Sequence, residues 1–318
     1  MPSAQNPLMF AARTLLLFAL LTGAVLAQVR PPVVIEGPID ALRMVNGEVV
    51  LTVMGRETRI GAAVPVRTPT TTLTLAQLVS PAPLPGRAQA GFLGATAVIT
   101  GEFDVTAAKI LAHDVFIEPA ENVMGGVVTA VVQGLVWVNG ARVLMLTDPR
   151  LPARPPVDPL GFAIDPGSAT VGAPAVAEGY WDGVEFRAHA LEIGGKTRLV
   201  DLRPQLVVER ATARELGPNA QRGDELEVRG AVTMLHVTRG TTTQAIAVSR
   251  VDGSRVTWLA TTTATPATDF PGFGTFSLRM TTPPSGDPEL GKAPRRVRVV
   301  NTSPGANGAM QEFDVVVR

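Results

Sequence analysis

The three histidines are the residues best suited to proton transfer or metal binding near neutral pH, so their spacing is the first test for catalysis. His113, His189 and His236 stand far apart, and none belongs to an H-x-H or H-E-x-x-H pattern. A metal centre needs several ligands that converge on one ion. His113 and His189 lie at equivalent places in two similar stretches. Strand alternation turns each ring toward the interior or the mouth of its domain, and we expect a hydrogen-bonded histidine at the edge of a core. We therefore expect no metal and no other cofactor.

Carboxylates and nucleophiles form no catalytic pattern either. Asp104 and Asp182 are equivalent and lie at hairpin turns, where an Asp side chain accepts hydrogen bonds from nearby backbone N–H groups. A glycosidase-type pair needs only to meet in space, and nothing in the sequence nominates one. There is no G-x-S-x-G motif and no cysteine, which excludes thiol catalysis and disulfides. The sequence thus predicts a protein without catalytic activity.

Aromatic residues are better candidates for a binding site. Tyr180 and Trp181 lie in the stretch GAPAVAEGYWDG, and Trp137 precedes it along the chain. With the Pro-rich segment 147–167 they are candidates for a patch that contacts carbohydrate. The full set of candidate ligand contacts is Tyr180, Trp181, Trp137, His189 and His113.

A second copy of the aromatic stretch assigns opposite roles to its two rings. Trp181 aligns with Phe103, and an aromatic at one place in both copies favours a residue that fills the domain interior. Tyr180 aligns with Glu102, so we expect Tyr180 to point outward and to be the stronger contact candidate.

The charge balance makes nucleic acid an unfavourable partner. Lys and Arg total 28, Asp and Glu also total 28, and aromatic residues make up only 5% of the 318 residues. Binding to phosphates needs a basic surface, and binding to single strands also needs stacked aromatic rings. We expect no nucleic-acid partner.

The N-terminal segment is typical of an export signal. Arg13 precedes an apolar run of about 14 residues, Thr14–Ala27, which is shorter than the roughly 20 residues of a membrane-spanning helix. Small residues before Gln28 predict cleavage after Ala27; an uncleaved anchor is the alternative. We expect a periplasmic or secreted protein with no other membrane segment.

The rest of the chain has the pattern of an all-β protein. Short runs rich in Val, Thr and aromatics alternate with Asn-Gly at 46–47, 139–140 and 307–308 and Asp-Gly at 182–183 and 252–253. One short helix is expected at Leu73–Val79.

An internal repeat organises the first two thirds of the chain. Residues 94–104 align without a gap on 172–182 through the shared pattern G-A-x-A-V-x-x-G-x-aromatic-D. Each copy contains three strands, a connection and a hairpin of two more strands, which suits an OB-like five-stranded barrel. Because the connection 147–167 of the second copy is rich in proline, we expect it to be an exposed loop rather than a helix.

The remaining strands differ from the repeat. About seven short strands between Leu206 and Val317 suggest an immunoglobulin-like β-sandwich with Trp258 as its core aromatic. The predicted organisation is a signal peptide at 1–27, OB-like barrels at 33–121 and 122–200, and the Ig-like sandwich at 204–318.

The two copies resemble a family of exported bacterial domains of unknown function with an OB-like small barrel. The corresponding residues are Leu75–Leu78, Gly94–Gly101 and Ala112–Ile117 in the first copy, and Gly172–Gly179 and Ala188–Ile193 in the second. The C-terminal segment is similar to the Ig-like domain that often follows such barrels. The resemblance covers 33–318 and implies a fold and an export route but no chemistry. The family's leucine-rich connection is missing from the second copy.

Two functions remain open from the sequence. The first is a non-catalytic exported scaffold or binding module of the bacterial cell envelope, with an envelope protein or a glycan as its partner. The second is a carbohydrate-binding protein that uses the aromatic side of the second barrel.

Overall fold

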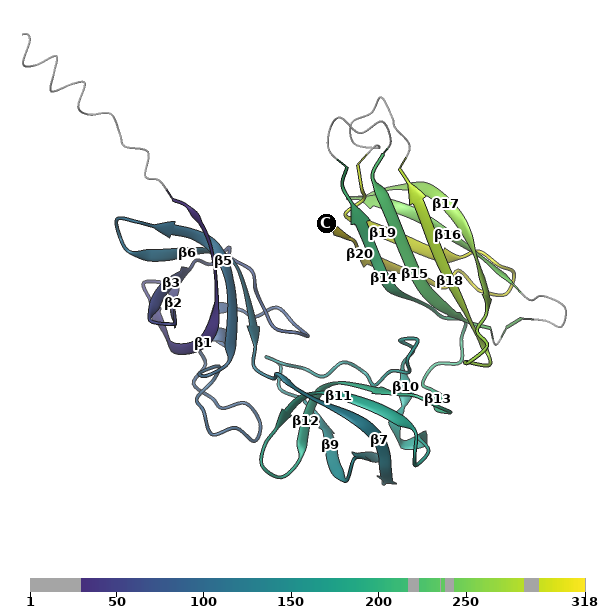
Figure 1. Ribbon diagram of the computed structural model, residues 1–318, viewed down its shortest axis with the longest axis horizontal. Coiled ribbons are helices and arrows are strands. Elements are labelled where there is room, and N and C mark those ends of the chain that lie inside the picture. Colours follow the sequence, from purple (N-terminus) through teal and green to yellow (C-terminus); the bar gives the residue numbers. More distant parts are fainter. Residues whose placement is uncertain (1–29, 217–222, 235, 238–242, 283–291, 318) are drawn as a thin grey trace, which may run out of the picture. The chain divides into compact units, whose positions relative to one another are not determined.

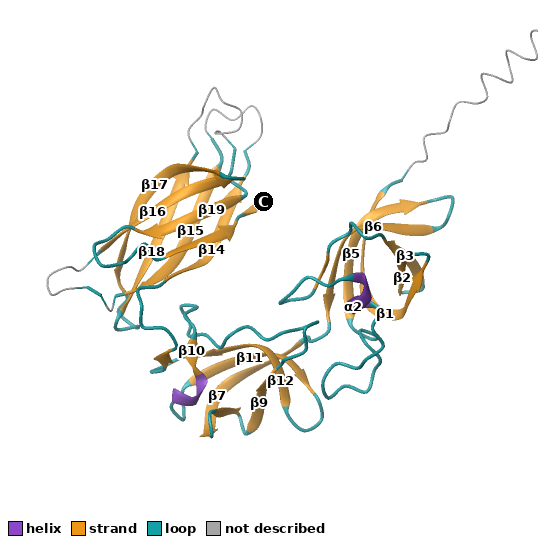
Figure 2. Ribbon diagram, turned by 180° about the vertical axis from the view of Figure 1, so that it is seen from behind, coloured by secondary structure: helices purple, strands orange, loops and turns teal. Residues whose placement is uncertain are grey.

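The computed structural model describes residues 30–216, 223–234, 236–237, 243–282 and 292–317. The predicted signal segment 1–27 lies outside these residues. The chain divides into two compact units, of which the first comprises the described residues up to 121 together with 146–153. The second comprises 122–145 and the residues from 154 onward. Both are built almost entirely of strands, so the predicted all-β class is confirmed (Figures 1 and 2).

The first unit is a ring-like sheet. Its strands are β1 (Pro32–Val45), β2 (Glu48–Val53), β3 (Arg56–Ile60), β4 (Val66–Arg67), β5 (Thr96–Asp104) and β6 (Lys109–Glu118). Antiparallel pairs join β3, β2, β1, β5 and β6 in that order, and a parallel pairing of β3 with β6 closes the ring. Strand β4 pairs in parallel with β6, beyond the residues of β6 that pair with β3.

The predicted short helix is present in the first unit. Helix α2 (Leu75–Leu78) begins after Thr74, whose hydroxyl accepts a hydrogen bond from the Gln77 amide, while the Gln77 side chain accepts one from the Thr74 amide (Figure 2). This reciprocal capping satisfies two N–H groups that the first turn would otherwise leave unpaired.

The second unit begins with a closed five-stranded barrel. Its strands are β7 (Asn122–Val132), β8 (Leu135–Val138), β9 (Ala141–Met145), β11 (Pro174–Trp181) and β12 (Phe186–Ile193). They pair in the order β11-β12-β9-β8-β7, with β7 returning to β11 and a parallel pairing between β9 and β12. This is the order of the first ring, as a duplicated sequence requires. The barrel also carries a small sheet of β10 (Ile164–Asp165) and β13 (Arg198–Leu199) and the single turn η1 (Pro166–Ser168).

An eight-stranded, nearly closed barrel follows in the same unit. Its strands are β14 (Leu206–Arg214), β15 (Glu225–Thr233), β16 (Gln244–Asp252), β17 (Arg255–Pro266), β18 (Phe273–Thr281), β19 (Arg296–Asn301), β20 (Met310–Asp314) and β21 (Val316–Val317). Strand β17 pairs with β16 over most of its length and with β18 only at Thr265 and Pro266. The core of this eight-stranded barrel is mostly aliphatic, with Phe276 among the buried residues.

Trp258 is not the core aromatic that the sequence suggested, because it is 64% exposed. The register of β16 with β17 shifts between Val248 and Ser249, and Leu259 is skipped in the pairing. Beyond this bulge the alternation changes side, so Leu259 packs against the core and Trp258 faces solvent.

The prediction that segment 147–167 is an exposed loop is also wrong. Leu151 and Phe162 are fully buried and Ile164 is nearly so. Arg150 is buried in the first unit, where its guanidinium donates to the carbonyls of Ala82 and Pro83 and to Asp148. The proline content excludes a helix there, as expected, but it does not prevent the apolar residues between the prolines from packing.

The predicted turn residues are confirmed. Asn46-Gly47 connects β1 to β2, with φ values of 52° and 83°. Asn139-Gly140 connects β8 to β9, with φ values of 50° and 83°. Two consecutive positive φ values define the tight hairpin turn for which Asn-Gly is the preferred pair.

Both barrels contain the same β-bulge. In the first, Thr100 pairs with Asp114 and Gly101 with Ala112, so His113 is the extra residue. In the second, the pairing of Glu178 with Ala190 and of Gly179 with Ala188 makes His189 the extra residue. The two histidines are therefore equivalent because each occupies the bulge of the fifth barrel strand.

Candidate ligand-binding site

The face of β8 and β9 is set by a two-residue turn. Val136, Val138 and Val143 are buried in the barrel core, so Trp137 and Arg142 project from the opposite face of the strands. The Asn139-Gly140 turn pairs Trp137 directly with Arg142. An aromatic ring and a guanidinium thus lie next to each other on the outside of the barrel.

Strand β12 adds charge to this face. Its parallel pairing with β9 aligns Phe186 with Val143 and Arg187 with Leu144. Phe186 and Val143 are buried in the core, so Arg187 and Leu144 lie on the outer side with Arg142.

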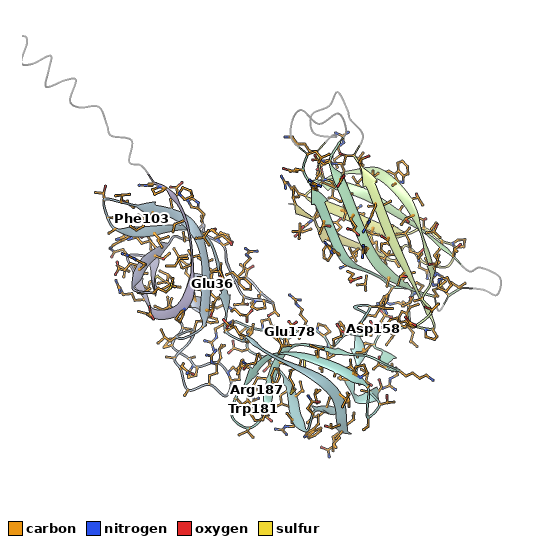
Figure 3. The ribbon with its side chains drawn as sticks, viewed as in Figure 1. Glu36, Phe103, Asp158, Glu178, Trp181 and Arg187 are labelled. Carbon is orange, nitrogen blue, oxygen red and sulfur yellow. The ribbon has the colours of Figure 1, made fainter. Side chains whose placement is uncertain are left out.

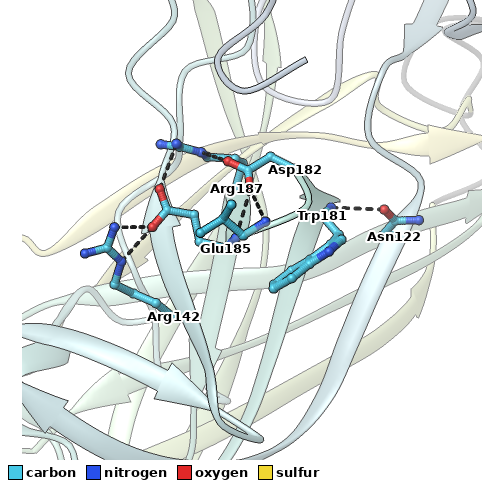
Figure 4. Close-up of polar contacts among 7 residues, drawn as sticks. Asn122, Arg142, Trp181, Asp182, Glu185 and Arg187 are labelled. Atoms are coloured by element: carbon cyan, nitrogen blue, oxygen red, sulfur yellow. Dashed lines mark hydrogen bonds and ion pairs between the residues drawn. The ribbon is translucent and has the colours of Figure 1, made fainter. Parts of the chain in front are cut away.

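Four charged side chains form a continuous network across β9 and the β11–β12 hairpin (Figure 4). Arg142 Nε donates to Glu185 Oε2 at 2.6 Å, and Arg187 pairs with Glu185 Oε1 at 2.7 Å. Arg187 Nε also donates to Asp182 Oδ2 at 2.7 Å. Two arginines and two carboxylates therefore hold one another, and the network carries no net charge.

Asp182 has the turn role predicted for it. Its Oδ1 accepts hydrogen bonds from the amides of Val184 and Glu185, at 2.9 and 2.8 Å. Asp104 does the same in the first barrel with Thr106 and Ala107. Burial alone would raise the pKa of Asp182, but the Glu185 amide, the Arg187 guanidinium and the Val184 amide together hold that pKa below its ordinary value.

Trp181 is the exposed aromatic of the site, contrary to the prediction that it fills the barrel. It is 50% exposed, and its backbone amide donates to Asn122 Oδ1 at 3.2 Å. Tyr180, which was expected to point outward, is only 5% exposed. The prediction rested on the alignment of Trp181 with Phe103 and of Tyr180 with Glu102. Burial along β11 alternates only as far as Gly179, next to the register shift, and Trp181 is the last residue of the strand.

The histidines do not take part in this site. His189 is buried, which fits an interior position, whereas His113 is exposed in the first unit, so of the two expected positions, interior or mouth, the interior does not apply to it. His236 belongs to the eight-stranded barrel. Among the described residues, no group of three or more His, Asp or Glu side chains is arranged to hold a metal ion.

A network of charged residues that the sequence did not single out thus extends from Arg142, the strand partner of Trp137, to Asp182, the residue that follows Trp181. We call this part of the barrel the aromatic face and define it as Trp137, Arg142, Trp181, Asp182, Glu185 and Arg187. The strand pairing of Trp137 with Arg142 could have been found from the Asn-Gly turn between them. The contact between Arg142 and Glu185 depends on the parallel pairing of β9 with β12, for which the sequence holds no local signal.

The first unit provides an internal comparison for this face. Gly55 follows β2 as Gly140 follows β8, and counting from these glycines places Thr52 and Glu57 where the second barrel has Trp137 and Arg142. Glu57 pairs with Lys109 at 3.0 Å and Arg43 at 2.6 Å, and these hydrogen bonds lower its pKa. The first barrel therefore keeps an ion-pair network at this place but carries no tryptophan.

A second group of carboxylates lies elsewhere on the second barrel. Figure 3 labels Asp158 and Glu178 apart from Trp181 and Arg187. Partial desolvation, followed by the negative charges of Asp158 and Glu178, raises the pKa of Glu192. Burial raises the pKa of Asp158, although Oδ1 accepts from the amides of Leu160 and Phe162 at 3.0 and 2.9 Å.

A scan against protein-family models, a search of curated proteins and a search of solved structures find no match to this chain. In the part of the chain that the structure describes, no helix is both long enough and apolar enough to span a bilayer.

Proposed function

We propose that this chain is a non-catalytic binding protein of the bacterial cell envelope, and that the aromatic face of the second barrel recognises a glycan. The observation that carries the proposal is the half-exposed Trp181 beside an ordered network of two arginines and two carboxylates. The export route rests on the N-terminal sequence pattern.

The strand arrangement supports the finer interpretation of the fold. Five strands that close in one order in both rings, with a long connection between the third and fourth, fit the OB-like type. In the eight-stranded barrel, β14, β15 and β18 pair on one side of β17, and β16, β19 and β20 pair on the other, which fits an Ig-like sandwich with β17 shared between its sheets. The resemblance to exported small-barrel domains is compatible with both assignments.

The position of the aromatic face on the barrel supports a binding role. Ligands of OB-like barrels contact the face of the second and third strands and the adjoining loops. In the second barrel these strands are β8 and β9, and the loop between the fourth and fifth strands is the hairpin of Asp182 and Glu185. The first barrel has Thr52 and Glu57 at the places of Trp137 and Arg142, so of the two five-stranded rings we assign glycan recognition only to the second.

The chemistry of the face favours a glycan over a nucleic acid. A sugar ring presents an apolar face to an aromatic side chain and hydroxyls to polar groups around it, and ligand sites commonly combine these two elements. Single-stranded nucleic acid would instead require a positive groove, whereas the charges here balance.

A protein partner is the second candidate function, because an apolar strip runs along another face of the same barrel. Val123, Val127 and Val176 are exposed on β7 and β11, and Val176 lies opposite Gly125 in the strand pairing. In-cell crosslinking tests this candidate: an envelope protein recovered from the wild-type chain but not from Val176→Asp would favour it over the glycan.

The test of the glycan proposal is retention of the exported chain on a broad glycan array. Trp181→Ala should lose retention while keeping the wild-type melting temperature, because half of the ring is already in solvent. Trp258→Ala removes an exposed tryptophan from the eight-stranded barrel and is the matched control that should retain binding. If the wild-type chain is retained by no glycan, or if both variants lose retention equally, the proposal fails.

A further inference from the structure

The eight-stranded barrel contains a hollow that the aromatic face does not involve. Its volume is about 500 Å³, and it lies between the segment after β15, the first residues of β16 and the β19–β20 connection. The polar residues that matter for its chemistry are His236, Gln244, Thr302 and Ser303. Small-molecule sites in proteins have volumes of roughly 300–1,000 Å³.

Gln244 supplies an unpaired donor to this hollow. It is only 1% exposed and shares the inward side of β16 with Ile246 and Val248. Its Oε1 accepts a hydrogen bond from Asn301 Nδ2, which fixes the orientation of the amide. In the described part of the chain its Nε2 has no hydrogen-bond partner. A buried donor left without a partner costs about 1–3 kcal/mol, so such a group calls for an explanation.

His236 adds two more unpaired atoms. Both Nδ1 and Nε2 are buried, and neither has a hydrogen-bond partner among the described residues. The ring lies against Gly305, where an added Cβ would be 3.3 Å from Cδ2 and where φ is +80°. A glycine at this position therefore lets the loop pass close to the imidazole.

The hydroxyls around the hollow are only partly used by the protein. Thr302 Oγ1 donates to the carbonyl of Ala245 at 3.1 Å, and Ser303 Oγ accepts from the Ala245 amide at 2.8 Å. The Ser303 hydroxyl can still donate a hydrogen bond to a ligand, and the Thr302 hydroxyl can still accept one. No Lys, Arg, Asp or Glu is among the lining residues that the structure describes.

From this donor and acceptor set we propose that the hollow binds a neutral polyhydroxylated ligand, such as a terminal hexose or a sugar alcohol. A hydroxyl group donates and accepts, so it matches an imidazole, an amide NH₂ and two hydroxyls at once. An anion would lack a cationic partner here, and an apolar ligand would leave three buried polar atoms unpaired. The site is independent of the aromatic face.

The test is NMR of the histidine ring nitrogens in the whole exported chain, titrated with glucose, galactose and sorbitol. Binding should shift the His236 signals and leave those of His113 unchanged. His236→Phe, which keeps a planar ring but removes the reporter signal, should weaken binding measured by titration calorimetry at least about tenfold, or 1.4 kcal/mol. Gln244→Glu keeps the acceptor for Asn301 while removing the donor, and it should weaken binding as well.

Control variants separate this site from the aromatic face. His113→Phe and Trp181→Ala should both leave the His236 response intact, so failure of the glycan proposal would not affect this result. If none of the three probes shifts the His236 signals, water alone is the hydrogen-bond partner of the unpaired His236 and Gln244 nitrogens, and the proposal is overturned. A response to acetate but not to the sugars would also overturn it, since that would identify an anion site.

Discussion

The carbonyl oxygen of Arg187 lies so close to Gly179 that a Cβ added to this glycine would be 1.9 Å from it. The same relationship joins Gly101 to the carbonyl of Leu111 in the first barrel, at 2.1 Å. Each glycine pairs with the strand residue just before the bulge histidine. The repeated glycines of the sequence are therefore a steric requirement of the bulge, and the bulge precedes the hairpin that carries Asp182 and Glu185.

Gly179→Ala should destabilise the second barrel by about 1–3 kcal/mol, the usual cost of forcing extra atoms into a packed region. Gly125→Ala is the matched control, because a Cβ there meets no atom within 4 Å. Thermal unfolding of both variants measures the difference. Equal melting temperatures would show that the strands tolerate a side chain at the bulge.

Arg150→Ala should destabilise the first unit by about 3–5 kcal/mol, because it leaves the largely buried Asp148 carboxylate without its partner. Hydrogen bonds from the Arg150 side chain, and then from its backbone amide, hold the pKa of Asp148 below its ordinary value despite burial. Arg56→Ala, on an exposed position of β3, should change the free energy of unfolding by less than about 0.5 kcal/mol. Denaturant unfolding measures the free energy of unfolding of both variants. Equal losses would contradict the role assigned to the Arg150–Asp148 pair.

Glu192→Gln should stabilise the second unit at neutral pH. The pKa of Glu192 is raised above the ordinary 4.5, so the folded state binds a proton more tightly than the unfolded chain. The ionised carboxylate therefore reduces stability above its raised pKa, and the reduction disappears as the pH falls through that pKa. Melting temperatures across an acid pH series should show the advantage of Glu192→Gln shrinking toward low pH. Glu178→Gln should also raise the melting temperature, because it removes one of the negative charges that act on Glu192. A variant of either residue that is less stable than wild type would contradict the interpretation.

Intact mass measurement of the mature protein should give Gln28 as its first residue. The apolar run before Ala27 is short of a membrane span, and small residues precede the predicted cleavage point. A mass that includes the N-terminal segment would support the uncleaved anchor instead.

The fold was largely predictable because its signals are local. Asn-Gly pairs marked the hairpins at 46–47 and 139–140, and the short helix appeared as LTLAQLV. The repeat predicted two domains with the same strand order, and the sheet pairings agree with it.

The orientation of individual aromatics was not predictable, since each error arose near a bulge. The alignment of the two copies did not fix the side on which Tyr180 and Trp181 lie, and Trp258 was assigned to the core without knowledge of the strand register. The pairing shifts before or beside each of these residues. A bulge depends on the partner strand as much as on the strand itself. The Arg142–Glu185 contact was missed for a related reason, because it joins β9 to the residue just before β12, 43 positions along the chain.

The most direct test of the central claim is an NMR titration that follows the indole N–H signals of the three tryptophans. A soluble mixture of envelope glycans is added to the chain from residue 28 onward, and the signals of Trp137, Trp181 and Trp258 are assigned by substitution. Recognition by the aromatic face predicts that the Trp181 signal shifts most, that Trp137 follows because it adjoins Arg142, and that Trp258 does not move. A shift confined to Trp258, or no shift of Trp181 at saturating glycan, would contradict the proposed function.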